Sequence, residues 1–396
     1  MRIAFAGGFA FSPKGTMQWR AHPLAAELVK LGHELTMFLT PYDNLADSGR
    51  KWELDGVRIS NLKVGSSQLS YPRLLVSLCR AICEYRPAMV HIFKPKGFAG
   101  ALGQYLLAKN METVVVDCDD WEGWGGWNDH KAYPWIVKEL IDRQERWMMC
   151  RAPAITVASR ALNERVHNIR GNRNGVYYVP NGLGCHSASA RERVRAFPSA
   201  ELRRSFNLPP DPIVLYSGRF DSSEESLFFC RAAANVAERH NAALVFVGDG
   251  PELPNVKDFF SVRSRPASYF FPRLPYEEFL RIIWTSDIAA FPYPDDAVHR
   301  SKCSARIIDY MMMGKPVLTS AVGQNEDYLV DGVSGMLATP GDERDFARKL
   351  DLLLQDSELR EHLGRNAEDR IQQRFCWSGE PLQQCLAAYQ HLGSKR

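Results

Sequence analysis

The sequence lacks several features that would place it in a specialised class of protein. No stretch approaches the ~18 consecutive apolar residues that a membrane-spanning helix needs. The nine cysteines are scattered and include no C-x-x-C pair, which argues against a disulfide framework or a zinc site. There is no low-complexity tract, and Met1 is followed by a strand-like segment rather than by a signal-peptide pattern. We therefore expect a globular, cytoplasmic protein.

The charge is unevenly distributed along the 396 residues, of which 24% are charged and 45% hydrophobic. Residues 1–200 carry 26 Lys and Arg against 18 Asp and Glu, whereas residues 201–396 carry 23 against 28. A basic first half suits an anionic lipid surface or a phosphorylated acceptor, and it equally suits a solvated surface without a special partner. Peripheral contact with the inner face of a membrane is therefore an expectation, whereas nucleic acid is not an expected partner.

Strand-like runs alternate with helix-like segments along most of the chain, and this alternation predicts parallel sheets covered on both faces. In the first half the runs lie at 2–6, 34–39, 89–93, 113–116, 154–158 and 176–179. A segment rich in Gly, Ser, Pro and charge follows, and the alternation then restarts at 213–217, 244–248, 268–271, 288–291 and 317–319. We predict an α/β fold of two Rossmann-like, doubly wound domains that face a central cleft, with the ligand site in that cleft.

Several strand ends carry residues suited to a phosphorylated ligand. Gly7 and Gly8 follow the first strand, where glycine lets the backbone approach a ligand, although the segment is not a G-x-G-x-x-G motif. In "LYSGRF", a strand ends before Arg219, whose guanidinium can grip a diphosphate with two hydrogen bonds. Gly248 opens a similar turn in "LVFVGDGPEL". The alternative for each motif is an ordinary turn at the end of a strand.

The stretch "HRSKCSARIIDYMMMGKPVLTS" predicts a helix that begins near Ser304. The backbone N–H groups from Cys303 through Ala305 to Arg306 would then present the positive end of the helix dipole, and Lys302 adds a full charge. Such a helix start is a cradle for an anion. Asp309, further along the helix, can accept the two adjacent hydroxyls of a ribose.

The segment "DCDDWEGWGGWND" combines acids with flat indole rings, a mixture suited to a sugar acceptor. Asp119 and Asp120 are the candidates to orient an attacking hydroxyl, and Trp121, Glu122 and Trp124 are the candidates to bind the acceptor. A metal cluster is a competing interpretation, and a structural turn with core tryptophans is another.

The preceding strand segment "VHIFKPKG" adds three further candidates on the acceptor side. They are His91, a catalytic candidate, and the acceptor-binding candidates Lys94 and Lys96. His91 is equally compatible with a hydrogen-bonded histidine at the end of a strand.

These motifs occur in an order that resembles the GT-B glycosyltransferases, specifically the large retaining family 4 that uses nucleotide sugars. The resemblance covers nearly the whole chain and rests on "AGG", "VHIFKPKG", "VASRAL", "VPNG", "LYSGR", "LVFVGDGP", "SDIAAFPY", "DYMMMGKPVL" and "NEDYLVDGVSGMLATPGD". It implies a metal-independent, retaining hexosyltransferase that transfers a sugar from a UDP- or GDP-type donor to a sugar, lipid-linked or small-molecule hydroxyl, with no cofactor.

The resemblance also implies roles for domains and residues. An acceptor-binding domain spans 1–182, a linker 183–211 and a nucleotide-sugar domain 212–375, and a last helix at 376–396 packs back toward the first domain. Arg219 binds the diphosphate and Asp309 the ribose. The donor set is completed by Gly7, Gly8, Gly248, Arg273, Leu274, Lys302, Cys303, Ser304, Ala305 and Arg306.

Several positions depart from the family pattern, among them Asp309, where relatives carry Glu, and Asp119-Asp120, where many relatives carry His-Asp. The residue five after Arg219 is Glu224 where relatives carry Lys, and the residue eight before Asp309 is Ser301 where relatives carry Glu. The alternatives to a transferase are therefore a catalytically impaired sugar-nucleotide-binding protein, or a nucleotide-sugar epimerase or phosphorylase on the same fold.

Overall fold

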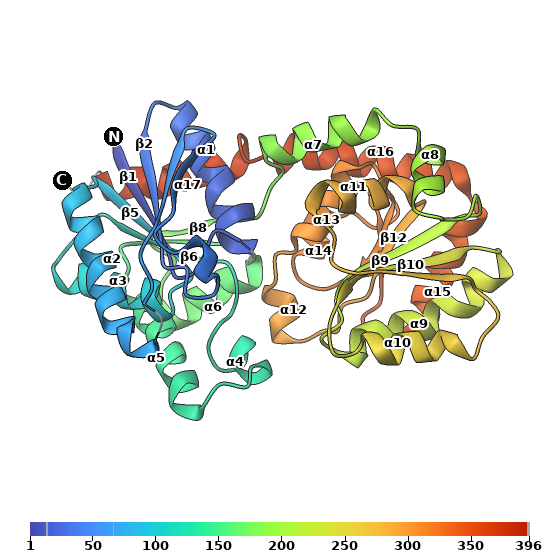
Figure 1. The fold of residues 1–396 in the computed structure, drawn as a ribbon, viewed down its shortest axis with the longest axis horizontal. Helices are drawn as coiled ribbons and strands as arrows, with labels where there is room; N and C mark the ends of the chain where they lie inside the picture. The colour runs from blue at the N-terminus through green and yellow to red at the C-terminus, as the bar shows by residue number, and fades with distance from the viewer. Residues whose placement is uncertain (13–14, 66, 394–396) are drawn as a thin grey trace. The chain divides into compact units, whose positions relative to one another are not determined.

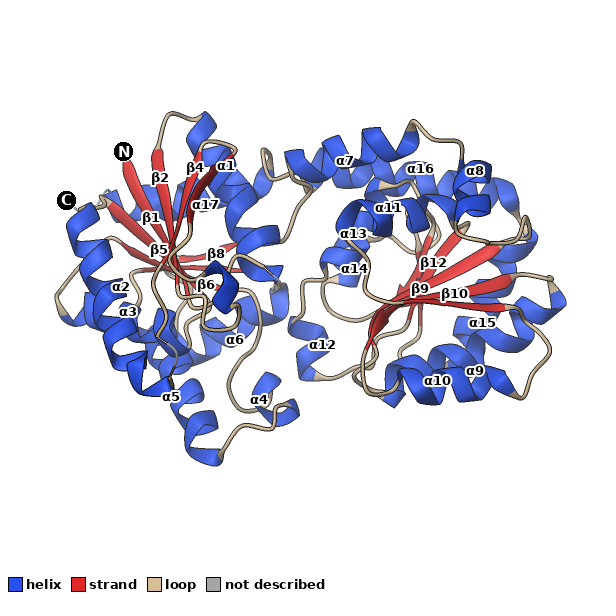
Figure 2. Ribbon diagram, in the orientation of Figure 1, coloured by secondary structure: helices blue, strands red, loops and turns tan. Residues whose placement is uncertain are grey.

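The computed structural model describes residues 1–12, 15–65 and 67–393, which form two compact units (Figure 1). Unit 1 comprises Met1–Gly184, Arg300–Cys303 and Phe375–Arg396, and unit 2 comprises Cys185–His299 and Ser304–Arg374. Each unit is built around one sheet, parallel in all but one described pairing, with helices packed against it (Figure 2).

The sheet of unit 1 has eight strands in the order β3-β4-β2-β1-β5-β6-β7-β8. All of its pairings are parallel except that of β3 with β4. The strands are β1 Arg2–Gly7, β2 Glu34–Leu39, β3 Lys51–Leu54, β4 Val57–Asn61, β5 Met89–Phe93, β6 Val114–Cys118, β7 Ala154–Val157 and β8 Val176–Tyr178. The central strands β1, β5 and β6 are buried on both faces, except for Arg2 at the start of β1, because helices cover both faces of the sheet.

The helices of unit 1 include one that comes from the far end of the chain. They are η1 Thr16–Ala21, α1 His22–Lys30, η2 Leu45–Asp47, η3 Gln68–Ser70, α2 Tyr71–Tyr85, α3 Gly97–Ala108, α4 Trp127–His130, α5 Trp135–Arg151, α6 Arg160–Arg170 and α17 Glu380–Gly393. Helix α17 packs on β7 and β8, and its Tyr389 and Leu392 join the apolar core beside β1.

Unit 2 holds a six-stranded sheet in the order β11-β10-β9-β12-β13-β14, with every described pairing parallel. The strands are β9 Ile213–Arg219, β10 Ala243–Asp249, β11 Ser268–Phe271, β12 Ile288–Phe291, β13 Val317–Ser320 and β14 Met336–Ala338. The helices are α7 Cys185–Arg195, α8 Ser199–Ser205, α9 Ser223–Arg239, α10 Leu253–Ser261, α11 Tyr276–Thr285, α12 Ala297–Ser301, α13 Ala305–Met312, α14 Asn325–Tyr328, α15 Glu343–Gln355 and α16 Ser357–Arg374.

The segment for which the sequence predicts a linker, 183–211, is largely helical. Helices α7 and α8 occupy most of it, and both pack against α11 of unit 2. The salt bridges from Arg191 and Arg195 to Glu368 of α16 further attach α7 to this unit.

The strand orders locate the place in each sheet where a ligand is expected. In unit 1 the chain winds outward from β1 through β2 and then from β5 through β8, so the order reverses between β1 and β5. In unit 2 the same reversal lies between β9 and β12. Ligands of open α/β sheets bind at the carboxyl ends of the strands beside such a reversal. Among the described residues, no helix is both long and apolar enough to cross a membrane.

Candidate active site

A lysine surrounded by three carboxylates lies at the carboxyl ends of β5 and β6 in unit 1. The Lys94 ammonium is 2.5 Å from Asp120 Oδ2, 2.9 Å from Glu122 Oε1 and 3.3 Å from Asp119 Oδ1. Lys96 also pairs with Glu122. The structure thus brings together five of the residues that the sequence predicts for the acceptor side, and the Lys94 ammonium takes the position that a metal ion would need among these carboxylates.

The three carboxylates differ in access to solvent, and the pKa values of Glu122 and Asp120 are shifted in opposite directions. Burial opposes the charge of Glu122, but Lys94 and Lys96 lower its pKa to about 2. The pKa of Asp120 is instead raised, because burial and the charges of Asp119 and Glu122 outweigh the attraction of Lys94. The Asp120 side chain is 24% exposed, whereas those of Asp119 and Glu122 are 9% and 3% exposed. Asp120 is therefore the member that an incoming hydroxyl can reach.

The loop that follows β6 and carries Asp119, Asp120 and Glu122 is called here the acidic loop. Carboxylates of helix α5 hold its backbone in place. Glu145 accepts hydrogen bonds from the backbone N–H groups of Glu122 at 2.8 Å and Gly123 at 3.1 Å, and Asp142 accepts one from Trp124 at 3.0 Å. Arg165 donates to Glu145 at 2.7 Å. These supports fix the backbone of the loop.

The three tryptophans of this loop are half-buried and pair with cations. The Arg165 guanidinium lies 3.9 Å from the centre of the Trp121 ring. The Lys138 ammonium lies 5.6 Å from the Trp124 ring, and the Lys302 ammonium lies 5.7 Å from the Trp127 ring. Lys302, which the sequence predicts beside the donor diphosphate, is thus part of unit 1 and next to an indole.

His91 lies in a buried hydrogen-bond network and not at the surface. Its ring nitrogens are hydrogen-bonded to Tyr389 at 2.9 Å and Thr156 at 3.1 Å, and the residue is 0% exposed. Thr156 donates a hydrogen bond to Asp117. Asp117 also accepts hydrogen bonds from Nε and Nη2 of Arg20, at 2.7 and 2.6 Å. Burial lowers the pKa of His91 well below its usual value. These contacts favour the structural alternative for His91 over a catalytic role.

Gly7 and Gly8 are buried at the end of β1. A Cβ on Gly7 would collide with the sulfur of Met17. This close approach accounts for Gly7 through packing, without a ligand.

In unit 2, the predicted donor residues gather at the carboxyl ends of β9, β10 and β11. Arg219 ends β9, its side chain is 72% exposed, and it pairs with Asp221 at 3.0 Å. Gly248 lies beside Gly218 on β10, and a Cβ there would collide with the Gly218 carbonyl. Arg273 and Leu274 follow β11, and Arg273 is exposed.

Helix α13 begins where the sequence predicts it, at Ala305, with Ser304 as the residue that precedes its first turn. Arg306 turns back from this helix, donates to the Ser217 carbonyl, and has its guanidinium 5.4 Å from the Phe291 ring centre. A Cβ on Gly218 would collide with that guanidinium, so a cation lies directly against the end of β9. Cys303 belongs to unit 1, where its carbonyl accepts from the Asn181 side chain at 2.7 Å.

Asp309 faces a tyrosine that the sequence does not predict for the site. The hydroxyl of Tyr276, the first residue of α11, donates to Asp309 Oδ1 at 2.8 Å. Burial raises the pKa of Asp309 to about 7, and the hydrogen bond from Tyr276 partly opposes this rise. Asp309 therefore changes charge near neutral pH.

A second missed cluster centres on His299, which lies between two acids. Its Nδ1 is 2.8 Å from Asp296 and its Nε2 is 3.1 Å from Glu225, in the first turn of α9. Glu224, at the position where relatives carry Lys, lies in the same turn. Asp296 and His299 are three residues apart, but Glu225 comes from a separate stretch of chain, so no local motif could have revealed the whole cluster.

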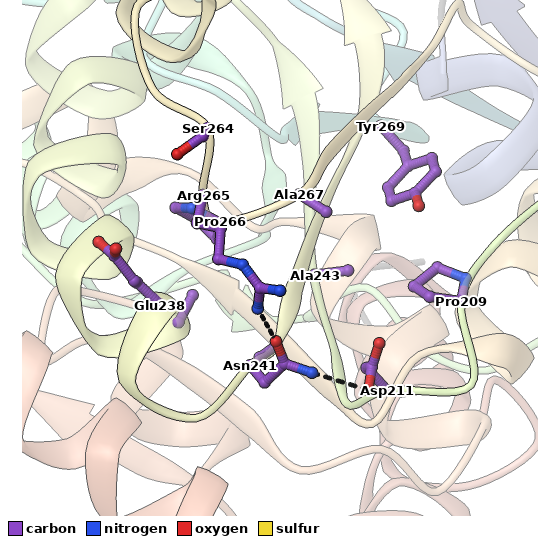
Figure 3. A pocket seen from close by; sticks show the side chains of 12 residues that line it. Pro209, Asp211, Glu238, Asn241, Ala243, Ser264, Arg265, Pro266, Ala267 and Tyr269 are labelled. Carbon is purple, nitrogen blue, oxygen red and sulfur yellow. Dashed lines mark hydrogen bonds between the residues drawn. The ribbon is translucent and has the colours of Figure 1, made fainter.

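A cavity in unit 2 lies away from all of these residues. It has a volume of about 270 Å³ and lies at the amino ends of β9, β10 and β11, opposite the predicted donor residues. Asn241 hydrogen-bonds to both Arg265 and Asp211 across it (Figure 3). Its lining includes Pro209, Asp211, Glu238, Asn241, Arg265 and Tyr269. In the described part of the chain, no group of three His, Cys, Asp or Glu is placed to hold a metal ion.

Two family models match the chain. Residues 15–182 match the glycosyl transferase 4-like domain, and residues 199–370 match glycosyl transferases group 1. Alpha-D-kanosaminyltransferase of Streptomyces kanamyceticus is 27% identical over 170 residues, 42% of this chain and 43% of that protein. Sulfoquinovosyl transferase SQD2 of Arabidopsis thaliana is 27% identical over 330 residues, 80% of this chain and 58% of that protein. The chain thus spans about half the length of these two relatives.

Solved structures share the fold over the whole chain. Sucrose-phosphate synthase (tll1590) from Thermosynechococcus elongatus aligns with a TM-score of 0.74 and 19% identity, covering 100% of both chains. Anabaena Alr3699/HepE in complex with UDP and glucose aligns with a TM-score of 0.70 and 15% identity, covering 100% of this chain and 99% of that chain. Together with the two family models, which account for most of both units, these likenesses identify the chain as a GT-B glycosyltransferase of the family 4-like group.

Proposed function

We propose that the protein transfers a sugar from a nucleotide-diphosphate sugar to a hydroxyl acceptor, with retention of configuration and without a metal. Unit 2 binds the donor and unit 1 binds the acceptor. The observation that carries the proposal is the pair of polar clusters at the carboxyl ends of the two sheets. One is cationic and suits a diphosphate, with Arg219 and Arg306, and the other is acidic and suits a hydroxyl, with Asp120.

In the proposed reaction, the acceptor oxygen approaches C1 of the donor sugar from the face on which the diphosphate departs, and it forms a bond to C1 as the bond from C1 to the diphosphate oxygen breaks, so the configuration is retained. The hydroxyl proton passes to the carboxylate of Asp120. The negative charge that develops on the diphosphate is stabilised by Arg219, Arg306 and the first turn of α13. Lys94 and Lys96 hold the acidic loop in place and neutralise two of its charges.

A thermal-shift panel of UDP- and GDP-sugars tests donor binding, and release of the nucleotide with and without an acceptor panel tests transfer. We expect one sugar nucleotide to raise the melting temperature and to be consumed faster with a hydroxyl acceptor present. Donor binding without any turnover would instead support the catalytically impaired binding protein. The presence of UDP-glucose in a structural neighbour, Anabaena Alr3699/HepE, makes UDP-glucose the first probe.

Donor binding is expected to depend on pH through Asp309. An ionised carboxylate accepts both ribose hydroxyls, whereas a protonated one does not. With a pKa of about 7 in the free protein, affinity rises as pH increases through 7 and is about tenfold weaker at pH 6 than at pH 8. Calorimetry at several pH values measures this, with a nucleotide sugar as the ligand because a terminal phosphate itself titrates near pH 6.

The matched control is Asp309→Asn, which should bind the donor weakly and almost independently of pH. It should also lose less affinity for a 2′-deoxy donor than for the ribonucleotide. An unchanged pH dependence in this variant, or equal losses for both donors, would show that Asp309 has only a structural role.

A further inference from the structure

Helices α2, α3 and α5 of unit 1 share an outer surface, called here the α2–α3–α5 surface, that exposes large apolar side chains. Helix α2 contacts α3, and α3 contacts α5 (Figure 1). The exposed apolar residues on it are Val76 at 57%, Tyr105 at 41%, Trp135 at 68%, Ile136 at 71% and Leu140 at 56%. An apolar groove of about 410 Å³ between α2 and α3 is lined by Leu75, Val76, Cys79, Ala101 and Tyr105, together with Arg80 and Cys83. Exposed apolar side chains gathered in this way mark an interaction surface.

The exposed charges of the same three helices are mostly positive. Among the fully exposed charged residues described for these three helices and the residues that directly follow them, Glu84 is the one acid. Two further acids of α5 are partly exposed: Glu139 pairs with Arg143 at 2.7 Å, and Asp142 accepts from the Trp124 backbone at 3.0 Å. The cations are Arg73, Arg80, Arg86, Lys109, Arg143, Arg146 and Arg151. Helix α3 itself carries no charged residue.

We propose that the α2–α3–α5 surface docks on an anionic lipid bilayer. Here exposed apolar side chains and arginines occur together, and the cations make the surface complementary to an anionic partner. That mixture matches a bilayer, since tryptophan and aliphatic side chains enter the boundary of the acyl region while arginines reach anionic headgroups. Trp135, Ile136 and Leu140 are the inserting residues, and Arg73 and Arg80 are headgroup contacts.

The proposal also bears on the acceptor, and this part rests on the proposed function. Helix α5 presents Ile136 and Leu140 outward, and its Asp142 and Glu145 hold the backbone of the acidic loop at Trp124 and Glu122. A bilayer bound to α5 therefore lies on the helix that holds the loop beside Asp120. This arrangement points to an acceptor hydroxyl on a lipid-linked molecule.

Co-sedimentation of the full chain with phosphatidylcholine vesicles that contain increasing fractions of phosphatidylglycerol tests the docking. Binding should rise with phosphatidylglycerol and fall with salt. The double variant Ile136→Glu, Leu140→Glu should bind at least about tenfold more weakly. Arg73→Ala and Arg80→Ala should each weaken binding about fivefold.

Two matched controls lie on unit 2: Val262→Glu, at a residue that is 86% exposed, and Arg204→Ala, at another exposed cation. Both should bind vesicles like the unaltered protein. Equal vesicle binding by the Ile136→Glu, Leu140→Glu variant would overturn the proposal. So would a lipid-free dimer in sedimentation velocity that this variant dissociates, because the surface would then belong to a second copy. A donor-induced rise in melting temperature, measured on the same samples, tests the proposed function separately from the docking.

Discussion

Replacing Asp120 by asparagine is expected to slow transfer by about 10²- to 10⁴-fold while the donor affinity stays unchanged. Asp120 is the most exposed of the three carboxylates around Lys94, and its pKa is raised, so it is suited to accept a proton from a hydroxyl. The change to asparagine keeps the shape of the side chain and removes its basicity. Steady-state transfer rates and donor calorimetry measure the two effects.

The pH profile distinguishes this role from a structural one. Because the ionised carboxylate is the active form, the transfer rate should rise with pH as Asp120 loses its proton. This rise should be absent in Asp120→Asn. Asp119→Asn is the matched control. Asp119 is 9% exposed and bonded by Thr16 at 2.8 Å, so its replacement should lower the melting temperature. If Asp120→Asn lost stability and donor affinity in parallel with activity, Asp120 would be a structural residue.

Most strands of both sheets were predictable because they are short, largely apolar and bounded by turn residues. The predicted strands at 34–39, 89–93, 268–271 and 288–291 coincide with β2, β5, β11 and β12. The hairpin of β3 and β4 was missed because β3 is largely exposed and β4 alternates, so neither forms an apolar run. Helices α7 and α8 were missed because their Ser- and Arg-rich sequence resembles a linker, and their packing against α11 is not visible locally.

The candidate site was predictable where residues are close in sequence. Asp119, Asp120 and Glu122 follow one strand, and Lys94 and Lys96 follow its neighbour, so parallel pairing of β5 and β6 brings them to the same edge. Contacts between distant segments were not predictable. The bond from Tyr276 to Asp309 and the support of the loop by Glu145 both join separate elements, and the burial of His91 depends on Tyr389 from the last helix.

Arg306→Ala is expected to weaken binding of the nucleotide-sugar donor by about 10- to 100-fold, since a charge-assisted hydrogen bond contributes about 1.5 to 3 kcal/mol. Arg306 lies against Gly218 at the end of β9, beside the strand order reversal where a diphosphate is expected. Arg219→Ala should have a smaller effect, because Arg219 is 72% exposed and already paired with Asp221. Calorimetry with UDP-glucose, or with the donor that the panel identifies, measures both losses.

Two further variants separate the charge of Arg306 from its geometry. Arg306→Lys keeps the charge but loses the planar group that can grip a diphosphate with two hydrogen bonds, so it should recover only part of the affinity. Gly218→Ala leaves Arg306 in the sequence but places a methyl group where the guanidinium lies, and it should weaken donor binding as Arg306→Ala does. Arg204→Ala, at an exposed arginine elsewhere in unit 2, should bind the donor normally. If folded Arg306→Ala and Gly218→Ala proteins both bound the donor like the unaltered chain, the diphosphate site would have to be assigned to other residues of unit 2.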